Sequence, residues 1–540
     1  MKRLSDKARG LIASLHEKPG IVNRAFSRSG WNLEALEKLG NTGEPGVIPY
    51  IVPVLHGGKR DEIIVAGKVI KRLLSRIEID TLPWLDELMR RSLYDGTWHR
   101  LEPRELAKWV GPGEPGVLLL QLSSMHANGF VREEAVRRLG LFHDGSELPY
   151  LLLRLNDWVI QVRQLAHDAI RDRINPDYAE SFVRNLTLVI RLQQVRRSDQ
   201  GDVLERIIRL LVSSPSRASM IDAMVRGPRD VRRASFRMLT VGAPQDQPQI
   251  LMSALEAPDS VVRLWAARLA RSALDRARLR SVLIPLSRDP SPPVRLEALR
   301  AWATSFPDEA MDIMVSALLD RNASVRAEAR LRLGEKDGMD FRHFYRNALA
   351  TTRAVVLVSG IAGLAETGAP EDATMLVPYL SHSLAKVRRT AVGCLLRLGG
   401  DDYLDLVFDR VLDASPGVSN QARTAVQRYA SRIGATRLSQ LFSASHMAHV
   451  RRNLLSLVGA LPKWESVTYL VRATRDGDES IATIARGYVV RWNSQYNRSQ
   501  TAPSGEQLAR LESALSEVGT GLSPSVVAEM RFAIRSFGKA

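Results

Sequence analysis

Apolar residues recur at intervals of four within short segments of this chain, and the segments themselves recur at a nearly constant spacing. From Val231 onward, each segment begins 31 or 32 residues after the previous one. The first apolar residues of the segments, here called anchors, are Val131, Val162, Val231, Val262, Val294, Val325, Val356, Val387, Val418, Val450 and Ile481. Positions 0, 4 and 8 of a segment lie on one stripe of an α-helix, so each segment is predicted to form an amphipathic helix.

The residue four places after the anchor is small in every segment but one. These residues are Ala135, Ala166, Ser235, Ala266, Ala298, Ala329, Gly360, Ala391, Ala422, Leu454 and Ala485. Position 8 carries a larger apolar residue in most segments. Because a small residue in the middle of a buried stripe allows a second helix to approach closely, the pattern predicts tight packing between neighbouring helices.

A second apolar stretch precedes the anchors, for example at residues 247–257 and 310–320. Short polar sequences such as APDS, DPSPP and DRNAS separate the two stretches and supply Asp and Ser as helix caps. Each unit is therefore predicted to be a pair of antiparallel helices, which must stack on its neighbours to enclose a core. The predicted fold is all-α, an α-solenoid of about eleven to fourteen stacked helix pairs.

The regularity of the repeat divides the chain into three predicted parts. Residues 1–112 form divergent helical repeats, residues 113–496 form the regular solenoid, and residues 497–540 form a linker and capping helices. The pentapeptide GEPGV opens a helical stretch at Gly43 and again at Gly113, and a degenerate unit is expected around Val195. The last two helices are expected near Leu508 to Val518 and Val526 to Phe537.

The recurring Val-Arg-x-x-Ala pattern resembles that of HEAT-repeat proteins, of the short-repeat kind common in bacteria, from Gly113 to about Asn493. The resemblance implies that the arginine after each anchor is structural and binds loop backbone or a loop aspartate in or beside its own unit. These structural arginines are Arg132, Arg163, Arg232, Arg263, Arg295, Arg326, Arg388 and Arg451. Leu357, Ser419 and Ala482 stand in the same place in three other units, which should therefore lack this contact. The resemblance indicates little about function, because HEAT repeats occur in scaffolds, in transport receptors and in a few enzymes.

The composition is that of a folded protein with an unusually positive charge. Of the 540 residues, 45% are hydrophobic and 25% are charged, and the formal net charge is +17. Arginine greatly outnumbers lysine and the basic residues are spread along the chain, so the charge can be compositional as well as functional. No signal peptide and no apolar run of about 18 residues is found, which makes a cytoplasmic protein without a membrane partner the expectation.

A second set of arginines is not explained by the repeat, and these residues are the candidates for a binding face. They are Arg137, Arg233, Arg237, Arg268, Arg300, Arg389 and Arg452. In HEAT solenoids the second helices line the concave surface, so these side chains could form a ladder that follows nucleic-acid phosphates. The alternative is that they are solvated and interleaved with glutamates such as Glu133, Glu134, Glu297 and Glu328.

Residues that could support catalysis or metal binding are few. His446 and His449 have helical spacing without a nearby carboxylate, and the single dipeptide His16-Glu17 is too little for a metal centre, so no metal and no cofactor is expected. The lone cysteine, Cys394, stands among apolar residues and is assigned to the core. No catalytic residue is assigned.

The segment NDWVIQVRQLA, residues 156–166, faintly resembles the lesion site of HEAT-like DNA glycosylases. The structural interpretation is favoured: Asp157 caps a helix, Trp158 packs on the preceding helix and Arg163 is the repeat arginine. A cleft that exposed Asp157 and Trp158 together would favour the enzyme instead.

These observations favour a non-enzymatic scaffold whose concave surface binds another protein, one with an acidic or extended segment. A nucleic-acid-binding solenoid is the alternative, and a glycosylase is a more distant third.

Overall fold

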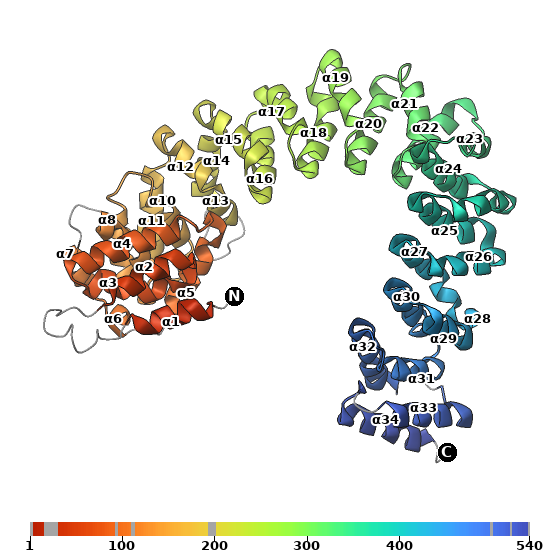
Figure 1. The fold of residues 1–540 in the computed structure, drawn as a ribbon. Helices are drawn as coiled ribbons and strands as arrows, with labels where there is room; N and C mark the ends of the chain where they lie inside the picture. The colour runs from red at the N-terminus through yellow and green to blue at the C-terminus, as the bar shows by residue number, and fades with distance from the viewer. Residues whose placement is uncertain are drawn as a thin grey trace. The chain divides into compact units, whose positions relative to one another are not determined.

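The computed structural model describes residues 4–15, 31–91, 96–109, 114–192, 201–496, 501–518 and 521–537. Across these residues the regular structure is entirely helical, with no strand. The chain forms two compact units, Met1–Leu286 and Ser287–Ala540 (Figure 1). This boundary falls inside the range predicted as one regular solenoid, and the predicted limits at residues 112 and 496 stay predictions.

The first unit contains the following helices: α1 (Asp6–Ser14), α2 (Leu33–Thr42), η2 (Pro45–Val47), α3 (Ile48–Gly57), α4 (Arg60–Leu74), η3 (Ile79–Thr81), α5 (Leu82–Arg91), α6 (Gly96–His99), α7 (Pro103–Trp109), α8 (Glu114–Ser123), α9 (Gly129–Leu139), α10 (Leu148–Arg154), α11 (Ile160–Asp172), η4 (Pro176–Tyr178), α12 (Ala179–Arg184), α13 (Leu186–Leu192), α14 (Gly201–Val212), α15 (Ser214–Arg226), α16 (Arg229–Gly242), η5 (Pro244–Asp246), α17 (Gln247–Leu255), α18 (Ser260–Ala273) and α19 (Arg276–Leu286).

The second unit contains the following helices: α20 (Pro292–Ser305), α21 (Ala310–Ala317), α22 (Ala323–Asp337), α23 (Phe341–Ala348), α24 (Ala354–Thr367), η6 (Pro370–Ser381), α25 (Ala385–Gly399), η7 (Gly400–Tyr403), α26 (Leu404–Asp409), η8 (Arg410–Leu412), α27 (Pro416–Val426), η9 (Gln427–Tyr429), α28 (Ala430–Ile433), α29 (Ala435–Ala444), α30 (Ala448–Val458), α31 (Lys463–Ala473), α32 (Glu479–Gln495), α33 (Gly505–Glu517) and α34 (Pro524–Phe537).

Successive helices pack in pairs within each unit, and the pairs stack on one another (Figure 1). Examples are α15 with α16 and α17 with α18 in the first unit, and α29 with α30 and α31 with α32 in the second. The predicted all-α solenoid of helix pairs is confirmed. The two C-terminal helices also form as expected and pack on each other. The degenerate unit expected around Val195 lies outside the described residues.

The anchors are buried in all predicted units except the one that begins at Val356. There Val356 is half-buried and Leu357 is buried instead, because α24 packs by way of two glycines. A Cβ atom on Gly363 would lie 2.1 Å from Cε1 of Tyr345, so only glycine allows the buried Tyr345 ring to pack there. Gly360 and Leu364, four and eight places after Val356, stay buried, so only the first position of the stripe changes in α24.

Loop residues begin the second helices as the breaker sequences predict. Asp259 in APDS accepts a hydrogen bond from the Val261 amide, and Asn322 in DRNAS accepts from Ser324. Each side chain satisfies an amide that has no partner inside the helix, which fixes where the helix starts.

Candidate binding site

The repeat arginines of several units join one loop to the next through a loop aspartate. In the second unit, Arg295 donates from Nε and Nη2 to the two oxygens of Asp320, at 2.7 Å each. Its Nη1 donates to the Asp289 carbonyl oxygen of its own loop at 2.7 Å. Oδ1 of Asp320 also accepts from the Asn322 amide at 2.7 Å. One carboxylate therefore fixes its own loop and connects two successive units.

An ion pair to the next loop recurs wherever an aspartate stands 25 residues after the repeat arginine, although Arg451 binds Asp476 through Nη2 alone and its Nε has no hydrogen-bond partner among the described residues. The pairs are Arg132 with Asp157, Arg295 with Asp320, Arg388 with Asp413, and Arg451 with Asp476. Arg163 and Arg263 donate to backbone oxygens of their own loops, those of Asp157 and Ala257.

Two units differ from the expected assignment. Arg233 rather than Arg232 binds the next loop carboxylate, with Nε 2.9 Å from Oδ2 of Asp259, because this aspartate stands two residues later than in the other loops. Arg326 binds Glu366 of α24, because Thr351 occupies the position of the loop aspartate. Arg233 was predicted as part of a binding face and is engaged in the fold instead.

The other candidate binding arginines are divided between the two units. Arg137 pairs with Glu133 and Glu134 on its own helix, and Arg300 pairs with Glu328 at 3.1 Å. The remaining residues have the following positions: Arg237 lies 5.6 Å from the centre of the Trp265 ring, Arg268 is exposed on α18, and Arg389 and Arg452 are exposed on α25 and α30.

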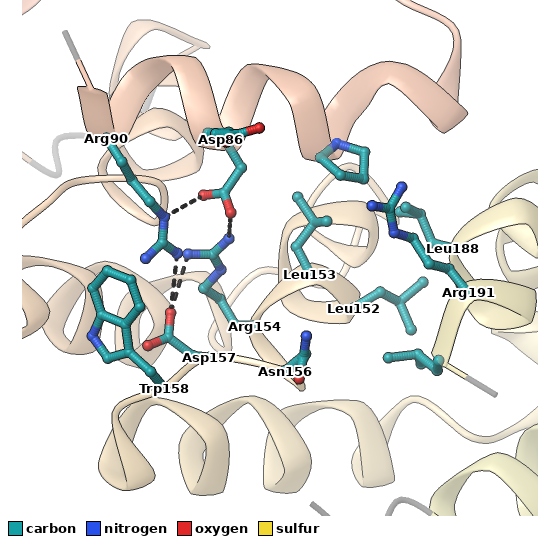
Figure 2. A pocket seen from close by; sticks show the side chains of 13 residues that line it. Asp86, Arg90, Leu152, Leu153, Arg154, Asn156, Asp157, Trp158, Leu188 and Arg191 are labelled. Carbon is teal, nitrogen blue, oxygen red and sulfur yellow. Dashed lines mark hydrogen bonds and ion pairs between the residues drawn. The ribbon is translucent and has the colours of Figure 1, made fainter. Parts of the chain in front are cut away.

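Asp157 departs from the other loop aspartates because it receives three guanidinium groups. Arg132 binds both of its oxygens, at 2.9 and 2.8 Å. Nη1 of Arg154 lies 3.1 Å and Nη2 of Arg90 lies 3.3 Å from Oδ2 (Figure 2). Oδ1 also accepts from the Val159 amide at 3.0 Å. The Asp157 side chain is 0% exposed, so all of these bonds form away from water.

A second carboxylate, Asp86 of α5, faces the same group of arginines (Figure 2). It lies 3.2 Å from Nε of Arg90 and 2.6 Å from Nη2 of Arg154. The arginines Arg90, Arg132 and Arg154 therefore share two carboxylates, which leaves one positive charge in excess. Nε of Arg154 is buried and has no hydrogen-bond partner among the described residues.

The electrostatic environment keeps both the Asp157 carboxylate and the Arg154 guanidinium of this cluster ionised. Burial alone would raise the pKa of Asp157, but the hydrogen bonds from Arg132 and the charge of Arg154 outweigh it, and the pKa lies below its ordinary value. Burial lowers the pKa of Arg154 below its ordinary value, with a further contribution from the like charge of Arg90. An arginine nevertheless stays protonated, so the excess charge persists at neutral pH.

A cavity of about 420 Å³ opens beside this cluster, between α5, α10 and α13. Its apolar lining comes from leucines: Leu152, Leu153, Leu188 and Leu192. Arg191 of α13 lies on the opposite side of the cavity from Asp157 (Figure 2). The Arg191 side chain is exposed and makes no ion pair or hydrogen bond within the described part of the chain. Glu87 of α5 also lines the cavity and pairs with Arg91. The cavity thus combines an apolar wall with positive charge on two sides and one carboxylate that is paired outside it.

Trp158 lies at the edge of this cavity and is 58% exposed. Two guanidinium groups lie over its ring, Arg90 at 4.7 Å and Arg132 at 4.9 Å from the centre. The expectation that Trp158 packs on the preceding helix is therefore wrong, because the indole is held by cation–π contacts instead. The prediction that Asp157 caps a helix is wrong, because the N-cap of α11 is Val159 and Asp157 accepts from the Val159 amide in the preceding loop. Asp157 is buried, so it is not exposed together with Trp158 and the glycosylase-like arrangement is not formed here.

Within each unit the helices form a repeat of stacked pairs. Solved structures with similar folds include Kap121p (14% identity, TM-score 0.31), importin beta (12%, 0.33) and a C-terminal fragment of the cohesin loader SCC2 from Chaetomium thermophilum (12%, 0.33). The matches cover 95%, 97% and 95% of this chain, and 64%, 80% and 42% of those chains respectively. No family model and no curated protein sequence matches the chain.

The described HEAT-like repeats contain no group of three or more His, Cys, Asp or Glu side chains placed to hold a metal ion. His449 contacts the Asp413 carbonyl oxygen at 3.0 Å, and the His16-Glu17 dipeptide lies outside the described residues. Burial raises the pKa of the Cys394 thiol to about 11, so the thiolate is scarce at neutral pH. None of the helices in the described ranges is both long and apolar enough to span a membrane.

The sequence analysis did not identify Asp86, Arg90, Arg154 or Arg191 as parts of a site. Asp86 and Arg90 lie in the divergent first part of the chain, where no repeat register is recognisable. The 25-residue interval between Arg132 and Asp157 is the one sequence signal that points to this cluster.

Proposed function

We propose that this protein is a non-enzymatic binding scaffold and that the cavity between α5, α10 and α13 binds an extended acidic segment of another protein. The observation that carries this proposal is the charge of the cavity. The buried cluster of Arg90, Arg132 and Arg154 has one guanidinium more than it has carboxylates, and Arg191 adds a second positive charge across the cavity. Glu87, which also lines the cavity, is paired with Arg91.

A carboxylate is the ligand group that best satisfies this arrangement. The planar guanidinium of Arg191 can donate two parallel hydrogen bonds to a carboxylate. Such a bond forms beside an apolar wall, where it is less screened than on an open surface. A glutamate or aspartate side chain on a partner protein would therefore form both an ion pair and hydrogen bonds here.

The apolar part of the cavity indicates that the partner segment also carries hydrophobic side chains. Leu152, Leu153 and Leu188 can receive one such side chain, and the exposed indole of Trp158 offers a second contact at the edge. Tryptophan and arginine are the residues that most often dominate protein–protein binding energy. An extended segment with an acidic residue next to apolar ones fits these features without any folding of the partner.

Nucleic acid is the second candidate, and the pairing of the arginines weakens it. Arg137, Arg233 and Arg300 each bind carboxylates of this chain, so they are not available as a continuous phosphate-binding ladder. Arg389 and Arg452 are exposed but belong to different helix pairs.

The proposal also includes two expectations from the sequence, namely a cytoplasmic location and the short repeats of the bacterial kind.

Selection from a random library of displayed peptides, each about twelve residues long, tests the proposal with the full-length chain as bait. We expect the selected peptides to be enriched in Asp or Glu beside apolar residues. Arg191→Glu should weaken the binding of a selected peptide by about ten-fold or more, since attraction becomes repulsion. Fluorescence anisotropy with the labelled peptide measures this change.

Arg184→Glu is the matched control, because Arg184 is an exposed arginine on the neighbouring α12 and does not line the cavity. Peptides without acidic enrichment, or equal binding to the Arg191 and Arg184 variants, would refute the proposal. Mixed-sequence single- and double-stranded DNA and RNA are titrated in parallel over a salt series. Tight, salt-sensitive binding that exceeds peptide binding would favour the nucleic-acid alternative.

A further inference from the structure

A second cavity lies wholly within the second unit, between α29, α30 and the end of α31. It has a volume of about 430 Å³, which is within the range of small-ligand pockets. Phe442 of α29 and Leu455 and Val458 of α30 supply apolar lining. Its polar lining includes arginines, serines and one aspartate. The cavity shares no residue with the one in the first unit.

Arg451 of α30 lines this cavity and departs from the other repeat arginines, because most of its hydrogen-bond donors are unused. The equivalent Arg388 donates from Nε and Nη2 to Asp413 at 2.8 Å each, and from Nη1 to two carbonyl oxygens of its own loop at 2.9 and 3.0 Å. The Arg451 side chain makes one hydrogen bond in the described part of the chain, from Nη2 to Asp476. Its Nη1 therefore has no acceptor among the described residues.

A contact with Phe442 explains the position of the Arg451 guanidinium but not its unused donors. The guanidinium carbon lies 4.8 Å from the centre of the Phe442 ring. A cation–π contact attracts the charge to the ring but supplies no oxygen acceptor for the N–H groups. An acceptor inside the cavity would supply what the loop carbonyl oxygens supply to Arg388.

Further donors come from two other elements of the same cavity. Ser439 and Ser443 stand four residues apart on α29, so they lie on one face of that helix. Neither hydroxyl makes a hydrogen bond within the described ranges. Arg475, in the turn after α31, donates from Nη1 to the Glu517 carbonyl oxygen and forms no ion pair with the described residues. Hydroxyl and guanidinium donors thus line the cavity from α29, α30 and this turn.

The carboxylates that accompany these arginines are already engaged. Asp476 is the one carboxylate in the lining; its side chain is 4% exposed and accepts from Arg451 and from a backbone amide at 2.9 Å. Arg472, which also lines the cavity, pairs with Glu517 of α33 at 3.3 Å. Among the lining residues and their ion-pair partners, the arginines therefore exceed the carboxylates by one, and Arg475 is the arginine left over.

From this combination we propose that the cavity binds a phosphate monoester. The phosphate group lies among Arg451, Arg475 and the two serine hydroxyls, and the apolar part of the ester lies against Phe442 and Leu455. A phosphate presents terminal oxygens in several directions and can accept from donors on three elements at once, whereas the two oxygens of a carboxylate lie in one plane. This inference goes beyond the peptide-binding function and does not depend on it.

Ligand-observed NMR with the full-length chain tests this proposal, with phenyl phosphate and glycerol 3-phosphate as the probes. Benzoate supplies a carboxylate on the same ring, and inorganic phosphate supplies the charge without an ester group. We expect at least one monoester to bind about ten-fold or more tightly than benzoate and inorganic phosphate. A peptide that carries phosphoserine is titrated in parallel. Tighter binding of this peptide or of the free monoester identifies whether the phosphate belongs to a protein side chain or to a small molecule.

Arg475→Gln should weaken monoester binding by about ten-fold or more, because the variant loses the unpaired charge. The double variant Ser439→Ala, Ser443→Ala should lower the preference for phenyl phosphate over benzoate by about three-fold or more, since hydroxyl donors are lost. Arg452→Gln is the matched control, because Arg452 is exposed on α30, donates to the Ala448 carbonyl oxygen and does not line the cavity.

Benzoate or inorganic phosphate binding as tightly as both monoesters would overturn the proposal. Equal monoester binding by the Arg475 and Arg452 variants would do the same. Neither variant should change the binding of a selected acidic peptide to the first unit, so failure of this proposal is distinguishable from failure of the proposed function.

Discussion

Asp157 and Asp413 occupy equivalent loops, one in each unit, and make the same two basic contacts. Each carboxylate binds the arginine that lies 25 residues earlier and accepts the backbone amide two residues later. Asp413 has Arg388 as its single ion-pair partner in the described chain. Asp157 has Arg132 and also Arg90 and Arg154. The same repeat element is thus a simple connection in one place and the centre of a charged cluster in the other.

The difference indicates how a binding site can arise within a structural repeat. The Arg388–Asp413 pair shows that one arginine is sufficient to connect two units. The contact from Arg132 alone would therefore be sufficient at Asp157. Arg90 and Asp86 both come from α5, outside the regular repeat, and this helix forms one side of the cavity. Function is therefore expected where additional side chains converge on the repeat, not along the repeat itself.

Replacement of each aspartate by asparagine should produce the largest difference between the two loops. Asp157→Asn leaves three guanidiniums with Asp86 alone in a buried setting, and we expect the free energy of unfolding to fall by about 3–5 kcal/mol. Asp413→Asn removes one charge-assisted pair and should cost about 1–3 kcal/mol. Urea denaturation of the full-length variants, followed by circular dichroism, measures both. Equal losses would contradict the distinction between the two loops.

Lowering the pH should reduce the difference in unfolding free energy between the wild type and the Asp157→Asn variant. The pKa of each aspartate is lowered in the folded protein, below the value of about 3.9 for an unfolded chain. Such a group contributes stability above its unfolded pKa and loses it as the pH falls through the folded pKa. Between pH 5 and pH 2, wild-type stability should therefore fall more steeply than that of Asp157→Asn. Parallel curves for the two proteins would show that Asp157 is not held ionised by the cluster.

Trp158→Ala should have a smaller effect on stability, because the indole is mostly exposed. We expect a loss of about 1 kcal/mol from its contacts with Arg90 and Arg132. Binding of a selected acidic peptide should weaken by more than this stability change implies, since Trp158 also forms the edge of the cavity. Trp265→Ala, at a tryptophan that contacts Arg237 in the first unit, is the comparison variant and should leave peptide binding unchanged.

Arg191→Gln should have the smallest effect on stability of all these changes. Its side chain is exposed and makes no ion pair within the described chain, so the free energy of unfolding should change by less than about 0.5 kcal/mol. Peptide binding should nevertheless weaken. A variant that unfolds more readily would show instead that Arg191 belongs to the structural cluster.

The helix pairs were predictable because a period of 31 or 32 residues repeats the same buried stripe many times. The choice between Arg232 and Arg233 as the arginine that binds Asp259 was not predictable, because it depends on a two-residue shift of the loop aspartate. The exposure of Trp158 was not predictable either, since a single aromatic residue beside a helix start is compatible with core packing and with a cation–π contact. Asp86 and Arg191 carry no sequence signal, because only the folded chain brings α5 and α13 to the same cavity.

Hydrogen–deuterium exchange of the full-length chain, with and without a saturating selected peptide, tests the location of the binding site most directly. The cavity between α5, α10 and α13 predicts that amides in residues 82–91, 148–158 and 186–192 become protected together. Protection of other helices, with these three segments unchanged, would contradict the assignment of the first-unit cavity as the site of peptide binding.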